Sequence, residues 1–504
     1  MSAGLAAAPT ALTHVDSRDI ATGEVMATYA AMDADAVADV VRRARSATAV
    51  WGRLGFDQRR MRLEAWATDL VDHSEELVTL IHRESGKPEA DAYLELVIAV
   101  EHIRWAARNA KRVLRSRRIR PTVLMANYAG VIDREPFGVV GVISPWNYPL
   151  FAPVAPIASA LAAGNAVVLK PSEHTTGVGA ELVAAFARAN ADLPGQLLAL
   201  ATGSAAAGAG LIAAPVDKLA FTGSPRTGRL ILEACAKTLT PTVMECGGKD
   251  ALIVAPDADV EQAADGAAWG GFSNAGQTCV GVERIYVHRD VAEAFIAALK
   301  RRLSRVQIGT DVGSTYGPMM LARQGETMRA QVQAAIQGGA GAPLGGAERV
   351  HGQFGEPILL VDADESSQAV QEETFGPMVT VRTVSSVEEA IRLANGTPFG
   401  LGAAVYSRRE GRRIASALRC GMVSINSVIA FVSIPALPFG GVGESGFGRI
   451  HGDEGLRTFS RTKSVSTKLY DIPAMNGMLL FRPRITLWAL KKMTNLRFGR
   501  TGRR

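Results

Sequence analysis

Cys279 stands at the end of a loop rich in small and amide side chains. The stretch FSNAGQTCVGVERIYV, residues 272–287, passes from Asn, Gly, Gln and Thr into an apolar run typical of a buried strand. A cysteine needed only for packing is expected inside a strand or on the apolar face of a helix. The placement of Cys279 instead presents a thiol, which indicates a nucleophile that forms a covalent adduct with its substrate.

Two polar residues at the ends of other apolar runs suit such an adduct. Glu245 lies between Val-Met and Cys-Gly-Gly, where partial burial raises the pKa of a carboxylate and suits it to act as a general base. Asn147, in SPWNYP, offers an amide donor for an oxyanion, although Asn before Tyr-Pro is also a common turn residue. We expect Cys235 and Cys420 to be packing residues.

The elements that must position these residues alternate between strands and helices. From residue 138 to about 426, short continuous apolar runs such as GVVGVIS and AVVLKP are separated by helical patterns. This alternation predicts parallel sheets with both faces covered, and ligands in such sheets bind beyond the carboxyl ends of the strands. The first 110 residues are predicted to be helices, and residues 115–137 have a basic, strand-like pattern.

Composition and charge are those of an ordinary globular protein with a basic tail. The chain has 504 residues, 47% of them hydrophobic, and a net charge of +6. Residues 472–504 hold eight basic and no acidic residues, so the preceding 471 carry 47 basic and 49 acidic ones. The four cysteines form no CxxC pair and histidines are sparse, so we expect no metal site and no disulfide framework. No signal peptide is recognised, so a cytoplasmic location is expected.

Seven loops occur in an order that resembles the aldehyde dehydrogenase superfamily. They are SPWNYP (144–149), LKPSE (169–173), FTGS (221–224), MECGGK (244–249), GQTC (276–279), EETFGP (372–377) and PFGGVGESGFGR (438–449). The resemblance implies an α/β fold of two Rossmann-like domains with a small β oligomerisation arm. It places the NAD-binding domain at 1–114 and 138–246, the catalytic domain at 247–455 and the oligomerisation elements at 115–137 and 462–471. A homodimer or tetramer is therefore expected.

The resemblance also implies a reaction and a role for each catalytic residue. Members oxidise aldehydes to carboxylic acids with NAD or NADP through a cysteine thiohemiacetal and thioester. Cys279 matches the nucleophile, Asn147 and the Cys279 N–H match the oxyanion donors, and Glu245 matches the base that activates the hydrolytic water. Because relatives that transfer the acyl group to coenzyme A typically lack this Glu, its presence favours hydrolysis.

The cofactor residues are likewise implied by the resemblance, because no G-x-G-x-x-G follows the first strand. Gly223, Ser224 and Gly228 match the turn that binds the pyrophosphate at a helix N-terminus. Lys170 and Glu173 match the adenosine ribose site, and Glu173 favours NAD over NADP because a carboxylate repels a 2′-phosphate. The residues expected near the nicotinamide and its ribose are Ser144, Trp146, Cys246, Glu373 and Phe375.

Three departures from the family pattern carry hypotheses. Cys246 replaces the usual Leu, which allows either a reversible disulfide with Cys279 or simple packing. Arg461 stands where many hydrolytic relatives carry a Glu that relays protons. The tail at 472–504 mixes apolar and basic residues, which suits either contact with an anionic membrane surface or packing on a partner subunit. Nucleic-acid binding has no accompanying module.

The substrate is the least defined part of the prediction. The loop Ser427–Pro435 carries Ile429, Phe431 and Val432 and no Arg, which favours an apolar aldehyde over a semialdehyde acid. A succinate-semialdehyde-type dehydrogenase is the alternative within the family. A cysteine-dependent esterase and a non-catalytic membrane-associated scaffold are the alternatives of other classes.

Overall fold

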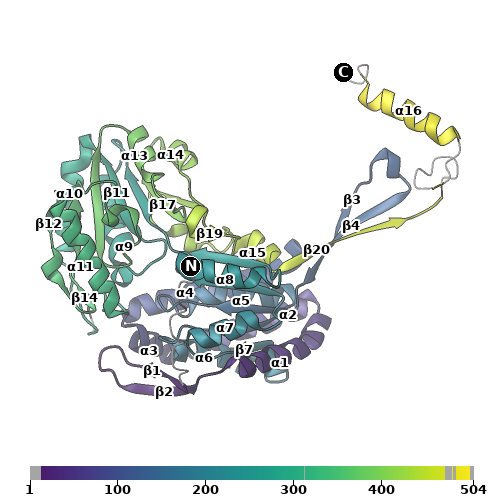
Figure 1. Cartoon of the computed structure of the whole chain (residues 1–504), viewed down its shortest axis with the longest axis horizontal. Coiled ribbons are helices and arrows are strands. Elements are labelled where there is room, and N and C mark those ends of the chain that lie inside the picture. The colour runs from purple at the N-terminus through teal and green to yellow at the C-terminus, as the bar shows by residue number, and fades with distance from the viewer. Residues whose placement is uncertain (1–12, 312, 472–479, 481–483, 500–504) are drawn as a thin grey trace, which may run out of the picture. The chain divides into compact units, whose positions relative to one another are not determined.

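The computed structural model describes residues 13–311, 313–471, 480 and 484–499 (Figure 1). Contacts within the chain divide it into two compact units. Unit 1 consists of Met1–Val113 and Pro136–Ser460, and unit 2 consists of Leu114–Glu135 and Arg461–Arg504. No helix among the described residues is both long and apolar enough to cross a membrane.

The first sheet of unit 1 has six strands, and its parallel strands are short apolar runs. Pairing is parallel throughout except between β19 and β9. In sheet order the strands are β19 (Gly446–Phe447), β9 (Thr242–Cys246), β8 (Lys218–Gly223), β5 (Val139–Ile143), β6 (Ala166–Lys170) and β7 (Leu198–Leu200). Because parallel strands end at one edge of a sheet, the loops after β5, β6, β8 and β9 meet there.

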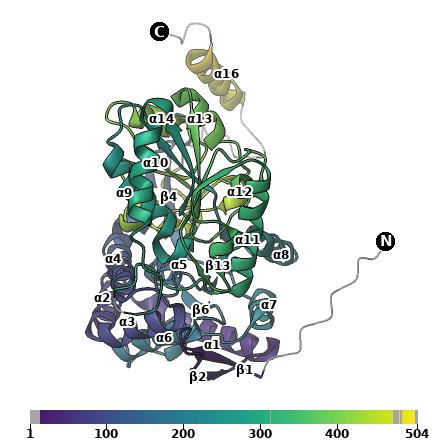
Figure 2. The same ribbon diagram turned by 90° about the vertical axis from the view of Figure 1, so that its left-hand side faces the viewer.

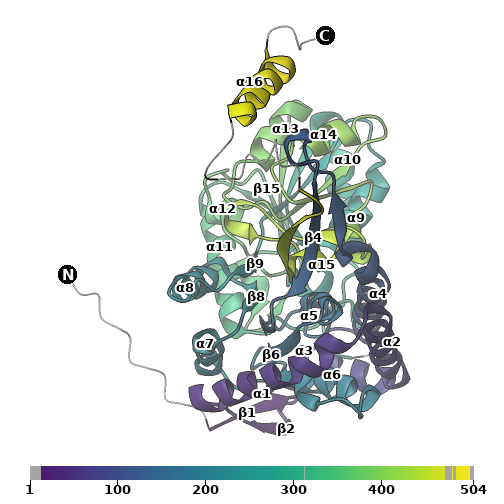
Figure 3. The ribbon, with the colours of Figure 1, turned by 90° about the vertical axis from the view of Figure 1, so that its right-hand side faces the viewer.

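Helices cover this sheet, and Figure 3 shows α1 and α7 side by side next to β6. Gly86, in the left-handed conformation at φ 71°, ends α3, as the Gly-Lys-Pro sequence predicts. The helices are α1 (Ala34–Arg53), α2 (Phe56–Asp72), α3 (Ser74–Ser85), α4 (Glu89–Leu114), α5 (Phe151–Ala163), α6 (Thr176–Ala189), α7 (Ala205–Ala213) and α8 (Pro225–Ala236).

The prediction that the first 110 residues are entirely helical is wrong. Strands β1 (His14–Arg18) and β2 (Val25–Ala30) form an antiparallel hairpin before α1. Thr22 and Gly23 turn between them, and Gly23 has a φ of 75°. Both strands are short and only partly buried, so their apolar pattern is weak.

The second sheet of unit 1 has seven strands, of which only β12 pairs in an antiparallel way. Helices α9 (Val260–Phe272) and α10 (Arg289–Leu303) pack on each other and against β11 (Figure 2). In sheet order the strands are β12 (Gly341–Leu344), β15 (Ile358–Val361), β16 (Met378–Val384), β11 (Val282–His288), β10 (Asp250–Val254), β17 (Gly402–Tyr406) and β18 (Met422–Ile425). The α/β fold class with parallel sheets is thereby confirmed.

The remaining elements of unit 1 are short, apart from α11. The strands β13 (Val350–His351) and β14 (Phe354–Gly355) form a small hairpin. The helices are α11 (Ala322–Gln337), α12 (Gln368–Gln371), α13 (Val387–Ala394), α14 (Gly411–Ala417), α15 (Gly452–Thr458) and the 3₁₀ turns η2 (Gly195–Leu197), η3 (Ser273–Gly276), η4 (Ala347–Arg349), η5 (Ala430–Ser433) and η6 (Gly443–Ser445).

The described residues of unit 2 form a three-stranded sheet in the order β20-β4-β3 and one α-helix. Its elements are β3 (Arg117–Ile119), η1 (Val123–Met125), β4 (Tyr128–Pro136), β20 (Ser460–Lys468) and α16 (Arg484–Phe498). Lys463 and Arg461 of β20 both pair with Glu135 of β4. Part of the predicted 472–504 tail lies outside the described residues, as do residues 1–12.

Candidate active site

One cavity of unit 1, about 350 Å³ in volume, collects most of the predicted site residues. Four predicted cofactor residues, Ser144, Lys170, Glu173 and Gly228, are not part of its lining. The predicted residues that line it are Trp146, Asn147, Gly223, Ser224, Glu245, Cys246, Cys279, Glu373 and Phe375. No cluster of potential metal ligands occurs among the described residues.

The loop before Cys279 has an unusual backbone. Asn274, Ala275 and Gly276 have consecutive φ values of 52°, 56° and 73°, a left-handed region that costs non-glycine residues free energy. A Cβ added to Gly276 would lie 2.2 Å from the Gly376 carbonyl oxygen, so only glycine fits. Gln277 braces the turn, since its Nε2 donates to the Asn274 carbonyl at 2.9 Å and its Oε1 accepts from Met320 N at 2.7 Å.

The Cys279 thiol is held in its protonated form by its surroundings. Burial, reinforced by the carboxylates of Asp250, Glu373 and Glu245, raises its pKa well above the ordinary value. A thiol in this state needs a base to remove its proton before it can attack.

Asn147 is fixed beside the cysteine loop by contacts from both sides. Its Nδ2 donates to the Gln277 carbonyl at 2.9 Å, and its own carbonyl accepts from Asn274 Nδ2 at 3.0 Å. The second hydrogen of Nδ2 has no partner among the described residues, so one donor remains for a ligand. The geometry therefore favours the oxyanion-donor interpretation over that of a plain turn residue.

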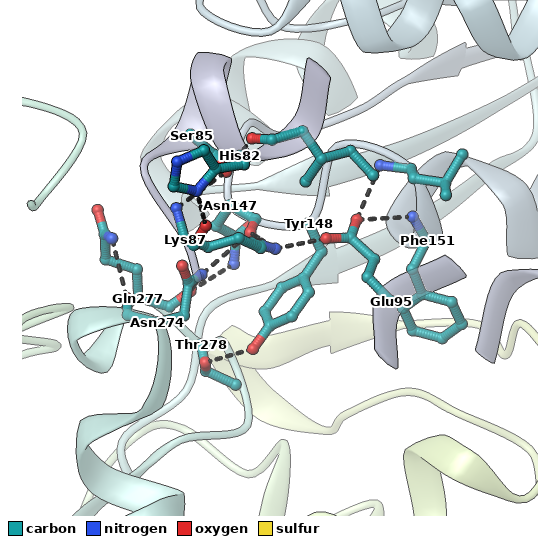
Figure 4. A network of polar contacts seen from close by, with 12 residues as sticks. His82, Ser85, Lys87, Glu95, Asn147, Tyr148, Phe151, Asn274, Gln277 and Thr278 are labelled. Atoms are coloured by element: carbon teal, nitrogen blue, oxygen red, sulfur yellow. Dashed lines mark hydrogen bonds and ion pairs between the residues drawn. The ribbon is translucent and has the colours of Figure 1, made fainter. Parts of the chain in front are cut away.

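A buried ion pair supports the Asn147 loop from behind (Figure 4). Lys87 and Glu95 pair with side-chain exposures of 0% and 1%, and Lys87 Nζ also donates to the Asn147 carbonyl at 3.0 Å. The Lys87 ammonium lies 4.1 Å from the centroid of the Tyr148 ring. Glu95 accepts from the backbone N–H of Leu150 at 2.8 Å.

This pair was not predicted from the sequence. Lys87 was recognised only as part of the Ser-Gly-Lys-Pro helix terminator, and Glu95 not at all. Tyr148, whose hydroxyl lies 2.9 Å from Thr278 Oγ1, joins the same network to the residue before Cys279. Lysine is rarely fully buried, so its burial could not be expected from residue type.

We expect Lys87→Met to destabilise the protein by about 3–5 kcal/mol, because it leaves the Glu95 carboxylate buried without its cation. The free energy of unfolding, from urea titration, checks this. The double variant Lys87→Met/Glu95→Gln removes both charges and should recover part of the loss. Equal stability of the single and double variants would contradict the electrostatic explanation.

Glu245 is the least satisfied carboxylate that lines the cavity. It is the penultimate residue of β9 and lies beside Thr222 of β8, it is 3% exposed, and neither carboxylate oxygen has a hydrogen-bond partner among the described residues. Burial raises its pKa well above 4.5, and the Arg449 guanidinium only partly opposes this. A buried carboxylate without donors has a strong tendency to take up a proton, as a general base must.

The cofactor residues lie along the C-terminal ends of the first sheet and the loop after α12. Ser224 caps α8, accepting from Thr227 N at 3.3 Å, and Pro225 opens the helix without an N–H, so the Arg226 N–H is the first-turn donor left for an anion at this positive helix end. Glu373 accepts from Gly248 N at 3.1 Å, and burial raises its pKa to about 8. Phe375, itself at φ 52°, meets Trp146 edge to face at 5.6 Å.

These residues fit a dinucleotide. The Ser144 Oγ is buried without a partner among the described residues, so a polar group is still to be supplied there. Lys170 Nζ lies 3.4 Å from Glu173 Oε2, and the side chains are 6% and 38% exposed, so a ribose can reach the Glu173 carboxylate. A Cβ added to Gly247 would lie 2.3 Å from the Glu373 carboxylate, so a larger residue at position 247 would displace that carboxylate.

Cys246 packs in the core as well as lining the cavity. Its Sγ lies 3.1 Å from the position that a Cβ on Gly228 would take, and it belongs to an apolar cluster with Phe221 and Cys235. Both Cys246 and Cys279 are free thiols. These contacts favour the packing interpretation over the disulfide hypothesis.

The rest of the lining is mainly apolar. Among the described lining residues the one arginine is Arg323. Asp91 also lines the cavity, and burial raises its pKa. The apolar lining includes Leu94, Ile98, Trp269, Ile429, Val432 and Phe439.

Comparison with known proteins places this geometry in context. The model of the aldehyde dehydrogenase family matches residues 7–465. A 4,4'-diapolycopene aldehyde oxidase of Methylomonas sp. is 39% identical over 435 residues, which cover 86% of this chain and 81% of that protein. A solved succinate-semialdehyde dehydrogenase from Burkholderia pseudomallei superposes with a TM-score of 0.86 at 34% identity, covering 90% of this chain and 94% of the other. A solved NADP-dependent enzyme of E. coli has the same TM-score and identity, covering 90% and 95%.

Proposed function

Because the chain belongs to the aldehyde dehydrogenase family, we propose that Cys279, Asn147 and Glu245 carry out its oxidation of an aldehyde to a carboxylic acid. The protein is an enzyme of this class, and NAD or NADP is its cofactor. The observation that supports the assignment is that all three residues line one cavity, with Asn147 tied to the cysteine loop through the Gln277 carbonyl.

In the proposed reaction the Cys279 sulfur attacks the aldehyde carbon after its proton has been removed. The carbonyl oxygen becomes an oxyanion, which accepts from Asn147 Nδ2 and the Cys279 N–H. Loss of one such donor typically costs about 3 kcal/mol of transition-state stabilisation. The bound nicotinamide supplies the hydride acceptor, and a thioester remains on Cys279.

Glu245 then activates the water that hydrolyses the thioester. The ionised carboxylate takes a proton from water, the hydroxide adds to the acyl carbon, and the carbon–sulfur bond breaks to release the acid and the thiolate. The burial of Glu245 and its lack of hydrogen-bond donors support this role, because both make protonation of the carboxylate more favourable.

We propose NAD as the preferred cofactor. Glu173, partly exposed beside Lys170, supports this because a carboxylate accepts from ribose hydroxyls and repels a 2′-phosphate. Lys170 is already paired with that carboxylate, which weakens its attraction for an added phosphate.

We propose a largely uncharged, apolar aldehyde as substrate. Asp91 and the apolar lining would both disfavour a carboxylate at the far end of a semialdehyde acid, and Arg323 is the one arginine of the described lining. The similarity to an enzyme named for a diapolycopene aldehyde points in the same direction, whereas the similarity to a succinate-semialdehyde dehydrogenase keeps that alternative open to test.

A panel of aldehydes tests the proposal. We expect NADH formation with medium and long alkanals and aromatic aldehydes, faster with NAD than with NADP, and little with succinate semialdehyde. Initial rates at saturating cofactor give kcat/KM for each aldehyde. A higher kcat/KM for the semialdehyde acid than for alkanals of similar length would overturn the substrate assignment. Ester hydrolysis without any NADH formation would favour the esterase alternative.

We also propose that the three-stranded sheet of unit 2 serves homo-oligomerisation and that the enzyme is cytoplasmic. Residues 461–468 of β20 and all of β3 are exposed within the described chain, and a three-stranded sheet with such exposure has little core of its own. A partner subunit would supply the missing cover. The proposal also includes the boundaries that the sequence predicts for the NAD-binding domain, the catalytic domain and the oligomerisation elements.

The helix α16 supports peripheral contact with an anionic membrane surface. Leu487 and Trp488 are 57% and 60% exposed, Lys492 lies 5.0 Å from the Trp488 ring, and the described part of the tail is basic. We expect the full chain to float with vesicles that contain anionic phospholipid and to be released by salt.

The variant Lys491→Glu/Lys492→Glu/Arg497→Glu should remain in the soluble fraction of the same flotation experiment, and a protein ending at residue 471 should do so as well. Equal flotation of the wild type and both variants would reject the role of the tail. Equal absence of flotation would favour packing of the tail on a partner subunit.

A further inference from the structure

His451 is the histidine of the described cavity lining, and its imidazole lacks hydrogen-bond partners. Neither the proposed catalysis nor cofactor binding explains this residue. The side chain lines the cavity, the residue is 3% exposed, and neither Nδ1 nor Nε2 has a hydrogen-bond partner among the described residues. Leaving a buried polar group unpaired typically costs about 1–3 kcal/mol. Such a cost is expected where a ligand completes the hydrogen bonds.

The backbone of His451 is also strained. Its φ of 64° and ψ of 165° lie in a region that glycine occupies almost alone, yet a histidine stands there. Backbone contacts hold it in place, since Gly455 N donates to its carbonyl at 2.7 Å and Gly452 N donates to the Pro435 carbonyl at 2.9 Å. His451 therefore combines a strained backbone with a side chain that has no hydrogen-bond partner among the described residues.

A second histidine stands against His451. The His102 ring centroid lies 4.2 Å from that of His451, and His102 is 4% exposed. His102 Nδ1 lies 2.8 Å from the Ile98 carbonyl, so Nδ1 carries the proton, and Nε2 is a lone-pair acceptor without a partner. Burial lowers the pKa of both rings, that of His102 to about 4, so both are neutral near pH 7.

The surroundings of this pair are apolar and leave room for a substrate tail. Phe151 and Phe439 pack on His451, with centroids at 5.6 Å and 5.3 Å. Ala152 and Ala155 of α5 line the same cavity with small side chains. The His451 imidazole is therefore a polar group among neighbouring side chains that are apolar.

We propose that His451 binds an uncharged hydroxyl group carried by the substrate away from its aldehyde carbon. The proposal deepens the proposed function and rests on it. A neutral imidazole offers one donor and one acceptor, which suits a hydroxyl that both donates and accepts. A carboxylate would meet lone pairs of neutral rings, with only one donor to receive it.

Matched pairs of substrates test this inference. For each chain length from about four to about ten carbons, kcat/KM is measured for the n-alkanal and the ω-hydroxyalkanal. The wild type should favour the hydroxyl compound at one length by about tenfold or more, since a buried hydrogen-bonding site discriminates against an analogue that leaves it unpaired. The length at the maximum reports the distance from Cys279 to His451.

Three variants separate hydrogen bonding from structure. His451→Leu should bring the kcat/KM values of the two members of each pair close together, and His451→Asn should retain part of the preference. His351→Leu, at an exposed histidine, is the matched control and should behave as the wild type. Thermal unfolding of each variant identifies any that fails to fold. If His451→Leu fails to fold, His451→Asn and the wild-type series of chain lengths still test the inference.

Two results would overturn the inference. In the first, the wild type prefers the hydroxyl compound at no chain length, as expected if water occupies the site. In the second, His451→Leu lowers kcat/KM equally for both members of each pair. Absence of NADH formation with every n-alkanal would instead reject the proposed function itself.

Discussion

Cys279→Ala is expected to abolish NADH formation with every aldehyde, by a factor on the order of 10⁴ or more, because no thiohemiacetal can form without the sulfur. The side chain is small, so the variant should fold, and its unfolding temperature should stay close to that of the wild type. Initial rates of NADH formation, measured at enzyme concentrations high enough to detect the residual activity, give the factor.

Cys420→Ala is the matched control for this substitution. Cys420 is also a partly buried thiol, donating to the Met422 carbonyl at 3.2 Å, and it is not part of the lining of the active-site cavity. The control should keep nearly full activity. Comparable losses in both variants would show that removal of a thiol harms the fold rather than the chemistry.

Glu245→Gln is expected to lower steady-state turnover by about 10² to 10⁴-fold while leaving a first burst of NADH. The burst arises because attack and hydride transfer precede hydrolysis, so the thioester accumulates on Cys279. Rapid-mixing measurement of the burst, together with the mass of the acylated protein, checks this. A variant that loses burst and steady state equally would place Glu245 before the thioester, as the base that removes the thiol proton.

The raised pKa of Glu245 fixes the direction of the pH dependence. The carboxylate acts as a base only when ionised, so wild-type turnover should rise with pH through the raised pKa, and Glu245→Gln should lack that rise. For stability, a folded-state pKa above the unfolded value favours the folded protein at low pH, and this contribution is lost as pH rises toward the folded pKa. The unfolding temperature of Glu245→Gln relative to the wild type should therefore increase as pH rises from the ordinary carboxyl pKa toward the raised pKa of Glu245.

The parts of the fold that were predictable are those whose sequence is uniform over an element. Strands such as Val139–Ile143 and Ala166–Lys170 are almost entirely buried, so every residue except the terminal Lys170 is apolar or glycine and the pattern is clear. The hairpin of His14–Arg18 and Val25–Ala30 was missed because its burial is partial and irregular. Its stability depends on contacts with α3 and α6 that no local pattern reports.

The candidate site was predictable where function depends on one residue in a short loop, and not where it depends on distant partners. Cys279, Glu245 and Asn147 each stand in a distinctive local sequence. The pairing of Lys87 with Glu95 depends instead on the way α4 packs behind the loop after β5. His451 was missed for a different reason, since a lone histidine gives no sign of a left-handed backbone or of an unpaired ring.

The left-handed run at Asn274, Ala275 and Gly276 bears on how this enzyme can be altered for new substrates. The loop has no freedom to accept other shapes, since Gly276 touches the Gly376 backbone and Gln277 is bonded on both ends of its amide. Changes there are expected to lose the nucleophile rather than redirect it. The side chains of Ala155 and Val432 carry no such constraint, so laboratory evolution toward bulkier or shorter aldehydes should accumulate its substitutions at those positions and leave the turn untouched.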